Sequence, residues 1–267
     1  MKHLLTIAGS DSIGGAGIQA DIKTFSAHGC YAMSVITAVT AQNTVAVTAV
    51  EDMTPEIIAA QMDAIFSDVR VDGVKIGMLS RAESIRVIAE KLRMYQPPVV
   101  VLDPVMVSKS GYALLQPEAI DALLSELLPL ATMLTPNLPE AEKITGKKIL
   151  KKTEMEAAAR EIAALGPRYV LIKGGHRQGE ADDLLFDGEE MQWLNGTRIE
   201  SPNTHGTGCT LSSAITANLA KGMPPYKAVA AAKAYLTGAI AHAFPTGHGH
   251  GSTNHFYQYW RQEDADR

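Results

Sequence analysis

The segment 203–210, Asn-Thr-His-Gly-Thr-Gly-Cys-Thr, combines residue types that can hold an anion beside a reactive thiol. Gly206 and Gly208 free the backbone to bend closely around a ligand, and the apolar run that follows predicts a helix over 207–221. The first N–H groups of a helix lack partners and carry partial positive charge, so such a helix start binds phosphate-like anions. Cys209 would lie in the first turn, where the dipole favours a thiolate. The alternative is a tight loop before a helix with a buried cysteine.

A second glycine-rich segment, from Gly9 to Asp21, follows an apolar run that predicts the first strand. Its glycines at 14, 15 and 17 do not have the spacing of a dinucleotide-binding fingerprint, and no Gly-Lys-Ser/Thr follows as in a P-loop. We expect instead a loop that holds a small polar substrate, with Asp21 on the following helix. The alternative is a glycine turn followed by a solvated aspartate.

Polar residues also stand just beyond the apolar runs that predict buried strands. They are Asp103, Lys173 and the pair Asn137 and Glu140. In open α/β sheets the ligand crevice lies outside the carboxyl ends of the strands, so we expect these side chains to converge there. Two carboxylates, an amide and a lysine beside an anion-binding helix start suit Mg²⁺ and a polyphosphate, because Mg²⁺ takes few protein oxygens and keeps several waters. Taken singly, each residue is better explained as a cap or a surface charge, and only their joint placement favours the site.

The elements that must position these residues are predicted by short apolar runs that alternate with amphipathic segments. This alternation is typical of an α/β fold, a doubly wound and mostly parallel sheet with helices on both faces. Asp-Gly and Asn-Gly pairs at 187–188 and 195–196 indicate hairpins, so we expect a small antiparallel edge between 181 and 201. No linker interrupts the pattern, and we expect a single domain over 1–267. The predicted strands are 4–8, 32–39, 71–76, 99–102, 132–134 and 169–172. Four helices are predicted over 15–28, 84–95, 207–221 and 226–244. Two further helices are predicted from their ends: one begins at Thr54-Pro55, and one begins with a capping box of Thr153 and Glu156 and ends at Gly166.

Composition limits the class of protein. Of the 267 residues, 46% are hydrophobic and 20% are charged, as in a globular protein rather than a disordered one. The net charge of −5 provides no basic field, so we expect no nucleic-acid partner. The apolar runs are far shorter than the ~20 residues that cross a bilayer, so we expect no membrane association. Two isolated cysteines, Cys30 and Cys209, fit a reducing compartment, and we expect a cytoplasmic protein.

Taken together, these motifs resemble the hydroxymethylpyrimidine and phosphomethylpyrimidine kinases of thiamine biosynthesis, in the ribokinase-like superfamily. The resemblance runs along almost the whole chain and implies a ribokinase-like fold. It also implies transfer of the γ-phosphoryl group of ATP, with Mg²⁺, first to the hydroxymethyl group of an aminopyrimidine and then to the monophosphate. The family commonly forms dimers, so we expect a homodimer. The matching segments are 5–12 (LTIAGSDS), 14–21 (GGAGIQAD), 41–44 (AQNT), 75–79 (KIGML), 103–106 (DPVM), 135–141 (TPNLPEA), 173–176 (KGGH) and 204–210 (THGTGCT).

The resemblance further implies roles for single residues in phosphoryl transfer. Cys209 takes the place of the general base, where most of the superfamily has an aspartate. A cysteine there marks this branch and some pyridoxal kinases. The anion hole would comprise Gly206, Thr207 and Gly208; Asp103 and Glu140 match magnesium positions; Lys173, Asn137 and Thr207 match contacts to the nucleotide phosphates.

The pyrimidine pocket is implied in the same way. It would be lined by Asp21, Gln42 and Met78, with Val105 nearby and Gly9 in the glycine-rich loop. Two departures from the family pattern are visible. Ile13 stands where a small residue is common, and His250 and Ser252 depart from the usual Gly-His-Gly-hydrophobic-Gly-Pro ending.

Two other functions compete with this assignment. A pyridoxine, pyridoxal or pyridoxamine kinase would have the same scaffold, and fold alone does not separate the two. Gln42 is the discriminator, because its amide can pair with the aminopyrimidine edge, whereas the similar vitamin B6 kinases tend to carry methionine there. A non-catalytic, ligand-sensing relative would have lost the base or the anion-hole glycines, and both are present here.

Overall fold

The computed structural model describes residues 1–107, 114–175, 181–196 and 198–260. Within these ranges the chain forms one nine-stranded sheet covered by helices. The strands are β1 (His3–Asp11), β2 (Tyr31–Gln42), β3 (Val47–Asp52), β4 (Gly73–Ile76), β5 (Val100–Leu102), β6 (Met133–Leu134), β7 (Tyr169–Ile172), β8 (Asp183–Phe186) and β9 (Met191–Leu194). The helices are α1 (Gly17–Ala27), α2 (Pro55–Phe66), α3 (Ala82–Tyr95), α4 (Ala119–Ala122), which continues into one π and one 3₁₀ turn to Leu130, α5 (Leu138–Thr145), α6 (Lys152–Ala163), α7 (Thr207–Ala220) and α8 (Pro225–Ala241).

The strand order is β3-β2-β1-β4-β5-β6-β7-β8-β9. The strands from β2 to β7 in this order are parallel, and β8 and β9 extend the sheet as an antiparallel hairpin. The predicted mostly parallel, doubly wound sheet with an antiparallel edge is therefore confirmed. Of the region 181–201 in which we expected antiparallel strands, residues 198–201 form no strand, and Thr197 lies outside the described residues.

A second antiparallel edge was not predicted. Strand β3 runs antiparallel to β2 at the opposite end of the sheet, with Ala38 opposite Asp52. Half of its six residues are exposed, and its sequence, Val-Thr-Ala-Val-Glu-Asp, lacks the continuous apolar run of a strand buried on both faces. The period-2 pattern of a surface strand is a weaker signal over six residues.

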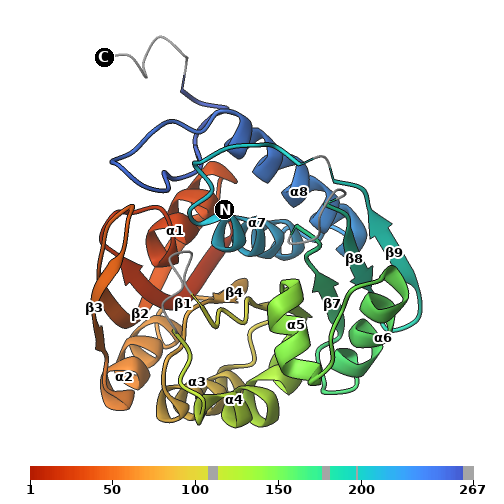
Figure 1. Ribbon diagram of the computed structural model, residues 1–267. Coiled ribbons are helices and arrows are strands. Elements are labelled where there is room, and N and C mark those ends of the chain that lie inside the picture. The colour runs from red at the N-terminus through yellow and green to blue at the C-terminus, as the bar shows by residue number, and fades with distance from the viewer. Residues whose placement is uncertain (108–113, 176–180, 197, 261–267) are drawn as a thin grey trace.

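The two faces of the sheet bury alternate side chains. In β5, Val100 and Leu102 pack into one core with α2 to α6, whereas Val101 packs into another with α7 and α8. Figure 1 shows α1, α7 and α8 together on one side of the sheet and α2, α3 and α4 on the other. Because strands buried on both faces need apolar residues at every position, their sequences show no alternation.

The direction of chain winding reverses between two neighbouring strands. From β1 the chain moves to β2 on one side, and from β4 it moves through β5 and β6 to β7 on the other. At such a switch point the loops beyond the carboxyl ends of the two strands diverge and leave a crevice for ligands. Here those loops begin at Asp11 after β1 and at Gly77 after β4.

The starts of α2 and α7 are as predicted, those of α1 and α3 each differ from the prediction by two residues, and the start of α6 requires a correction. Thr54 caps α2, with Pro55 at the first helical position. The capping box expected at Thr153 and Glu156 is wrong by two residues: α6 begins at Lys152, and the Glu154 carboxylate accepts from the Lys151 N–H at 3.0 Å. A lysine is a poor cap residue, which hid this start in the sequence.

Candidate active site

The two glycine-rich segments, which the sequence presents separately, pack directly against each other at the switch point. Gly206 precedes α7 with a φ of 80°, and a Cβ built there would lie 1.7 Å from the carbonyl oxygen of Gly15. A Cβ on Gly15 would in turn lie 2.5 Å from Cδ2 of His205. Both glycines are therefore required for this close approach, in addition to the left-handed backbone of Gly206. The segments 9–21 and 203–210 form one site.

The start of α7 is the anion-binding feature of this site. Among the described residues, no backbone carbonyl accepts from the N–H groups of Gly208 or Cys209. A Cβ on Gly208 would lie 3.3 Å from Asp103 Oδ2 and 3.7 Å from Lys173 Nζ. The helix start with its unpaired donors thus lies beside the side chains that follow β5 and β7, and together they can hold a phosphate.

Lys173 and Asp103 form an ion pair at the carboxyl edge of the sheet. Lys173 Nζ lies 2.8 Å from Asp103 Oδ1, which also accepts from the Thr135 hydroxyl at 3.2 Å. Burial favours a neutral lysine, but the carboxylates of Asp103 and Glu140 outweigh it and raise the pKa of Lys173. A fixed positive charge therefore stands beside the α7 helix start, as a polyphosphate site requires.

Asn137 and Glu140 form a reciprocal capping box at the start of α5. The Asn137 side chain accepts from the Glu140 N–H at 2.9 Å, and the Glu140 carboxylate accepts from the Asn137 N–H at 2.7 Å. The capping alternative for Asn137 is therefore realised in this structure. Burial raises the pKa of Glu140 to about 7, against the opposing charge of Lys173. The charge of Glu140 near neutral pH therefore depends on the pH and on whether a cation besides Lys173 lies next to it.

The thiol of Cys209 corrects one sequence-based expectation. We expected the helix start to lower its pKa, but burial raises the pKa to about 11, although the Lys75 ammonium acts in the other direction. The backbone N–H of Gly17, at the start of α1, points at the sulfur. Desolvation outweighs the dipole at this half-buried residue, and the ligand-free site holds a neutral thiol.

Asp21 lies deeper than the sequence suggested. Its carboxylate is fully buried and binds Lys75 Nζ through both oxygens at 2.8 Å. The hydroxyls of Thr6 and Ser213 donate to it at 2.6 and 2.7 Å. These bonds use the four acceptor positions of a carboxylate, so a substrate contact would require one of them to be exchanged. Lys75 begins the segment 75–79, but the sequence assigned it no role, because a lysine in an apolar run gives no indication of its partner.

Three residues expected to line the pyrimidine pocket, Gly9, Met78 and Val105, lie close together. A Cβ on Gly9 would lie 3.0 Å from the sulfur of Met78. Met78 belongs to a small apolar cluster with Ala38, and the half-buried Val105 packs against it. Gln42 is half-buried at the end of β2, and its amide lies 3.2 Å from His205 Nε2. His205 and its partner Asp11 are further residues to which the sequence assigned no role.

The residues that depart from the family pattern also lie at this site, and two of them, His250 and Ser252, belong to the C-terminal loop. Ser252 and His205 form an isolated parallel β-bridge. A Cβ built on Gly15 would lie 3.1 Å from the Cβ of Ser252. The His250 N–H donates to the carbonyl of Thr44 at 2.9 Å. Ile13, the departure in the first glycine-rich segment, donates its N–H to Asp11. His176, in the quoted motif 173–176, lies outside the described residues.

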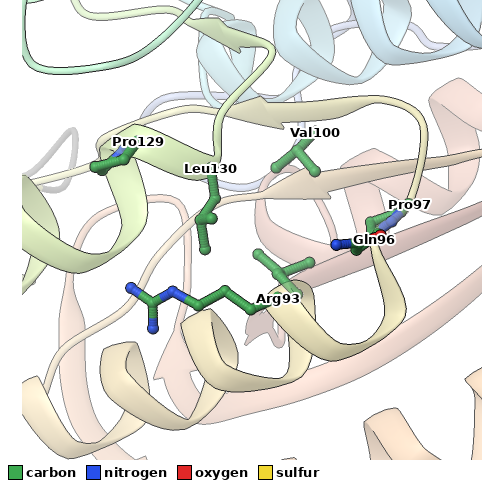
Figure 2. A pocket seen from close by; sticks show the side chains of 7 residues that line it. Arg93, Gln96, Pro97, Val100, Pro129 and Leu130 are labelled. Atoms are coloured by element: carbon green, nitrogen blue, oxygen red, sulfur yellow. The ribbon is translucent and has the colours of Figure 1, made fainter.

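A separate hollow lies at the opposite ends of the strands. It has a volume of about 320 Å³ and is lined by the end of α3, the start of β5 and the turn at Pro129 and Leu130. Figure 2 shows Val100, the first residue of β5, in its wall. Because ligands of open α/β sheets bind beyond the carboxyl ends, this hollow is not part of the candidate active site.

No helix within the described ranges is long and apolar enough to cross a membrane. The same ranges hold no cluster of three or more His, Cys, Asp or Glu side chains placed to bind a metal ion.

Comparison with known proteins agrees with this geometry. The family model for phosphomethylpyrimidine kinase matches residues 11–254. A hydroxymethylpyrimidine/phosphomethylpyrimidine kinase of Rhizobium meliloti is 58% identical over 261 residues, which cover 96% of this chain and 98% of the relative.

Solved structures show the same fold. The crystal structure of a phosphomethylpyrimidine kinase from Clostridium difficile aligns with a TM-score of 0.82 and 52% identity, over 90% of this chain and 100% of that one. An ADP complex of Bacillus subtilis pyridoxal kinase aligns with a TM-score of 0.89 and 40% identity, over 97% and 98%. The ribokinase-like fold and the kinase assignment predicted from the sequence are confirmed. The chain belongs to the phosphomethylpyrimidine kinase family, the kinases of thiamine biosynthesis.

Proposed function

We propose that this kinase phosphorylates 4-amino-5-hydroxymethyl-2-methylpyrimidine and then its monophosphate, with ATP as donor, at the single site described above. The observation that carries the proposal is the start of α7. Its unpaired N–H groups belong to a first turn that also carries the Cys209 thiol and that lies, at Gly208, beside the Asp103–Lys173 pair. Phosphoryl transfer asks mainly for in-line positioning and charge stabilisation, and preorganised backbone donors supply both.

The donors at the helix start act on the phosphoryl group that is transferred. In this proposal the backbone of Gly206, Thr207 and Gly208 surrounds its equatorial oxygens, where negative charge is carried in the transition state. Lys173, with its raised pKa, stays charged and holds the leaving phosphates of ATP. Asn137, at the start of α5, adds a polar contact if the capping bond to Glu140 is exchanged.

Cys209 acts as the general base in the first reaction only. The hydroxymethyl oxygen attacks the γ-phosphorus, the bond from that phosphorus to the β,γ-bridging oxygen breaks, ADP leaves, and the hydroxyl proton passes to the sulfur. The thiol must first lose its own proton, because burial raises its pKa to about 11. In the second reaction the nucleophile is a phosphate oxygen that is already anionic, so no base is needed. One site can therefore serve both reactions.

A magnesium ion fits the acidic residues of this site. Asp103 and Glu140 lie close enough for the Asp103 charge to raise the pKa of Glu140, and Lys173 offsets both. Such a pair of hard oxygen ligands matches Mg²⁺, which completes its shell with water and phosphate oxygens. Bound there, the ion would neutralise phosphate charge; Asp103 and Glu140 would hold it.

The pyrimidine would lie between the two glycine-rich segments. Met78 and Val105 provide apolar surface for the ring, and Gly9 leaves room beside the Met78 sulfur. Gln42 presents its amide from the end of β2. Asp21 supports the floor of the pocket through Lys75 and contacts the ring only if one of its present bonds is exchanged.

The wider setting is proposed on general grounds. One sheet with helices on both faces supports a single kinase domain over 1–267. Two free cysteines fit a reducing cytoplasm. We expect a homodimer with small-molecule substrates and neither a nucleic-acid nor a membrane partner, and sedimentation of the purified protein measures the subunit number.

The test is a product assay by mass spectrometry. The purified protein is mixed with ATP, Mg²⁺ and, separately, the pyrimidine alcohol, its monophosphate and pyridoxal. We expect the monophosphate from the first and the diphosphate from the second. If pyridoxal alone is phosphorylated, the protein is a vitamin B6 kinase and this substrate assignment is wrong.

A further inference from the structure

Three side chains from distant segments form a hydrogen-bonded row beside the pocket. Nε2 of His205 lies 2.8 Å from Asp11 Oδ2 and 3.2 Å from the amide nitrogen of Gln42. Asp11 ends β1, Gln42 ends β2, and His205 lies just before α7. His205 and Asp11 are buried, whereas Gln42 is half-buried. The row therefore connects the residue proposed to face the pyrimidine with two residues that have no part in the proposed phosphoryl transfer.

The carboxylate of Asp11 determines where the proton of His205 lies. Its Oδ1 accepts from the Ile13 N–H at 3.1 Å, and its Oδ2 accepts from the N–H groups of Gly15 and Ala16 at 3.0 and 2.8 Å. Burial opposes ionisation, but the bonds from His205 and the backbone together lower the pKa of Asp11. A carboxylate can only accept hydrogen bonds. His205 Nε2 must therefore carry a hydrogen, whether the ring is neutral or charged.

The same reasoning fixes the amide of Gln42. An Nε2–H group cannot accept, so the amide NH₂ cannot be its partner. At the other end of the amide, Gln42 Oε1 lies 3.5 Å from Thr40 Oγ1, whose single hydroxyl hydrogen is directed to the Ser10 carbonyl at 3.0 Å. A half-turn of the amide keeps its shape and removes both conflicts. Oε1 then shares the single Nε2 hydrogen of His205 with Asp11 Oδ2, as the longer branch of a bifurcated bond, and the NH₂ group donates to Thr40.

We infer that His205, held by Asp11, is a positioning residue that makes Gln42 a hydrogen-bond donor toward the substrate. The amide oxygen is occupied by His205 and one N–H by Thr40, so the second N–H is what remains for a ligand. A donor recognises an acceptor, which in an aminopyrimidine is a ring nitrogen rather than the exocyclic amino group. Gln42 therefore reads the ring nitrogen N3, beside the carbon that carries the amino group. This inference rests on the proposed function, which places Gln42 against the pyrimidine.

The first experiment measures the proton directly. In ¹⁵N-labelled protein, the ring resonances of His205 are identified as those that vanish in His205→Gln. We expect Nε2 to be protonated and to lose that pattern in Asp11→Asn, where the acceptor for the proton is changed. An unprotonated Nε2 in the wild-type protein would overturn the inference, because the amide of Gln42 would then be free to donate to His205.

The second experiment measures which substrate atom Gln42 reads. The kcat/KM of the first phosphorylation is compared for the parent pyrimidine, its 3-deaza analogue and its 4-desamino analogue, in wild type and Gln42→Met. Removing N3 also changes ring basicity, so only the part of each penalty that disappears in Gln42→Met counts. We expect that part to be roughly tenfold or more for the 3-deaza analogue and near onefold for the desamino analogue.

Variants of His205 separate positioning from general damage. His205→Gln can still donate to an amide oxygen, so it should keep the preference for N3. His205→Leu should reduce that preference while the KM for ATP stays within a few-fold. Equal losses for all three pyrimidines in His205→Leu, or a larger Gln42-dependent penalty for the desamino analogue, would overturn the inference and leave the proposed function standing. If wild type phosphorylates no pyrimidine, the proposed function itself is wrong.

Discussion

Two opposing influences act on the pKa of the Cys209 thiol. The start of α7 and the Lys75 ammonium favour its thiolate, whereas desolvation of this half-buried residue favours the thiol and dominates, with a pKa of about 11. A base with such a high pKa is strong when ionised but is rarely ionised at neutral pH. The two reactions of the enzyme should therefore respond differently to changes at this residue.

Replacing the sulfur tests its role as a base. Cys209→Ala should lower kcat for the first phosphorylation by roughly 10²–10⁴, the usual contribution of a positioned general base. The second phosphorylation should fall far less, because its nucleophile is already anionic. Steady-state assays with the alcohol and with the monophosphate measure both. Similar losses in the two reactions would indicate that Cys209 serves the anion hole or the packing instead.

The pH dependence of the first reaction follows from the same pKa. Because the active form is the thiolate and the pKa is about 11, the ionised fraction grows with pH throughout the neutral range. We expect kcat for the alcohol to rise about tenfold per pH unit between about pH 7 and 9. The rate with the monophosphate should stay nearly flat there, since a phosphate monoester with a second pKa near 6 is already a dianion. A flat profile for the alcohol would exclude Cys209 thiolate as the base.

Glu140 offers a test of the proposed magnesium site. Burial raises its pKa to about 7, so at pH 8 it is mostly ionised and available to a cation. Glu140→Gln keeps its shape and should raise the Mg²⁺ concentration for half-maximal rate at pH 8. Lowering the pH of the wild type through 7 should have the same effect, because protonation removes the same charge. If titrations of the two proteins superimpose at pH 8, Glu140 only caps α5.

At the scale of elements, the site depends on how closely α7 approaches the loop after β1. The helix is preceded by its N-cap residue Gly206, which has a φ of 80° and lies against the carbonyl of Gly15. At its other end, Gly222 has a φ of 88°, and a Cβ there would meet nothing within 4 Å. These two glycines share a backbone conformation and differ in their surroundings, which makes them a matched pair.

Gly206→Ala should therefore be far more harmful than Gly222→Ala. The left-handed backbone alone costs an alanine about 1–2 kcal/mol, and Gly222→Ala should lose about that much stability. Gly206→Ala adds a clash with Gly15, so it should lose more and abolish both phosphorylations by displacing the helix start. Urea unfolding and assays of both reactions provide the comparison. Equal destabilisation by the two substitutions would mean that the loop at Gly15 moves to accommodate the added methyl group at little cost in stability.

At the scale of the whole molecule, one buried ion pair ties four elements together. Lys75 of β4 binds Asp21 of α1, and that carboxylate also accepts from Thr6 of β1 and Ser213 of α7. Both charged side chains have no exposed surface. The Asp21 carboxylate outweighs burial and keeps the pKa of Lys75 raised, so the ammonium stays charged. The pair lies under the crevice and joins the strands of the switch point to both glycine-rich segments.

Breaking this pair should destabilise the whole fold. Lys75→Met leaves a buried, unpaired carboxylate and should lower the free energy of unfolding by about 3–5 kcal/mol. Adding Asp21→Asn removes that charge and should restore much of the loss. Lys147→Met, in the exposed pair with Glu161, is the control and should cost less than about 1 kcal/mol. Denaturant unfolding of the four proteins measures these values, and a loss in Lys75→Met no larger than the control would show that Asp21 readily becomes neutral.

The sequence by itself determined the sheet, its parallel strands and the segments that bear the chemistry. Periodicity does this because a strand buried on both faces, as β5 is, must be apolar at every position. The glycines of 9–21 and 203–210 were also readable, since only glycine permits the backbone geometry found at Gly206. Family resemblance then supplied the assignment of Cys209, Gln42 and the acidic residues to roles, which stay predictions.

Tertiary structure alone decided the charges and the partners of those residues. The pKa of Cys209 depends on how fully the protein encloses the sulfur, which is a property of packing and not of the local sequence. The partners of Asp21 and Gln42 come from 54 and 163 residues away in the chain, so no local pattern could pair them with Lys75 and His205. Local spacing encodes backbone geometry, whereas desolvation and hydrogen-bond complementarity arise only when distant segments meet.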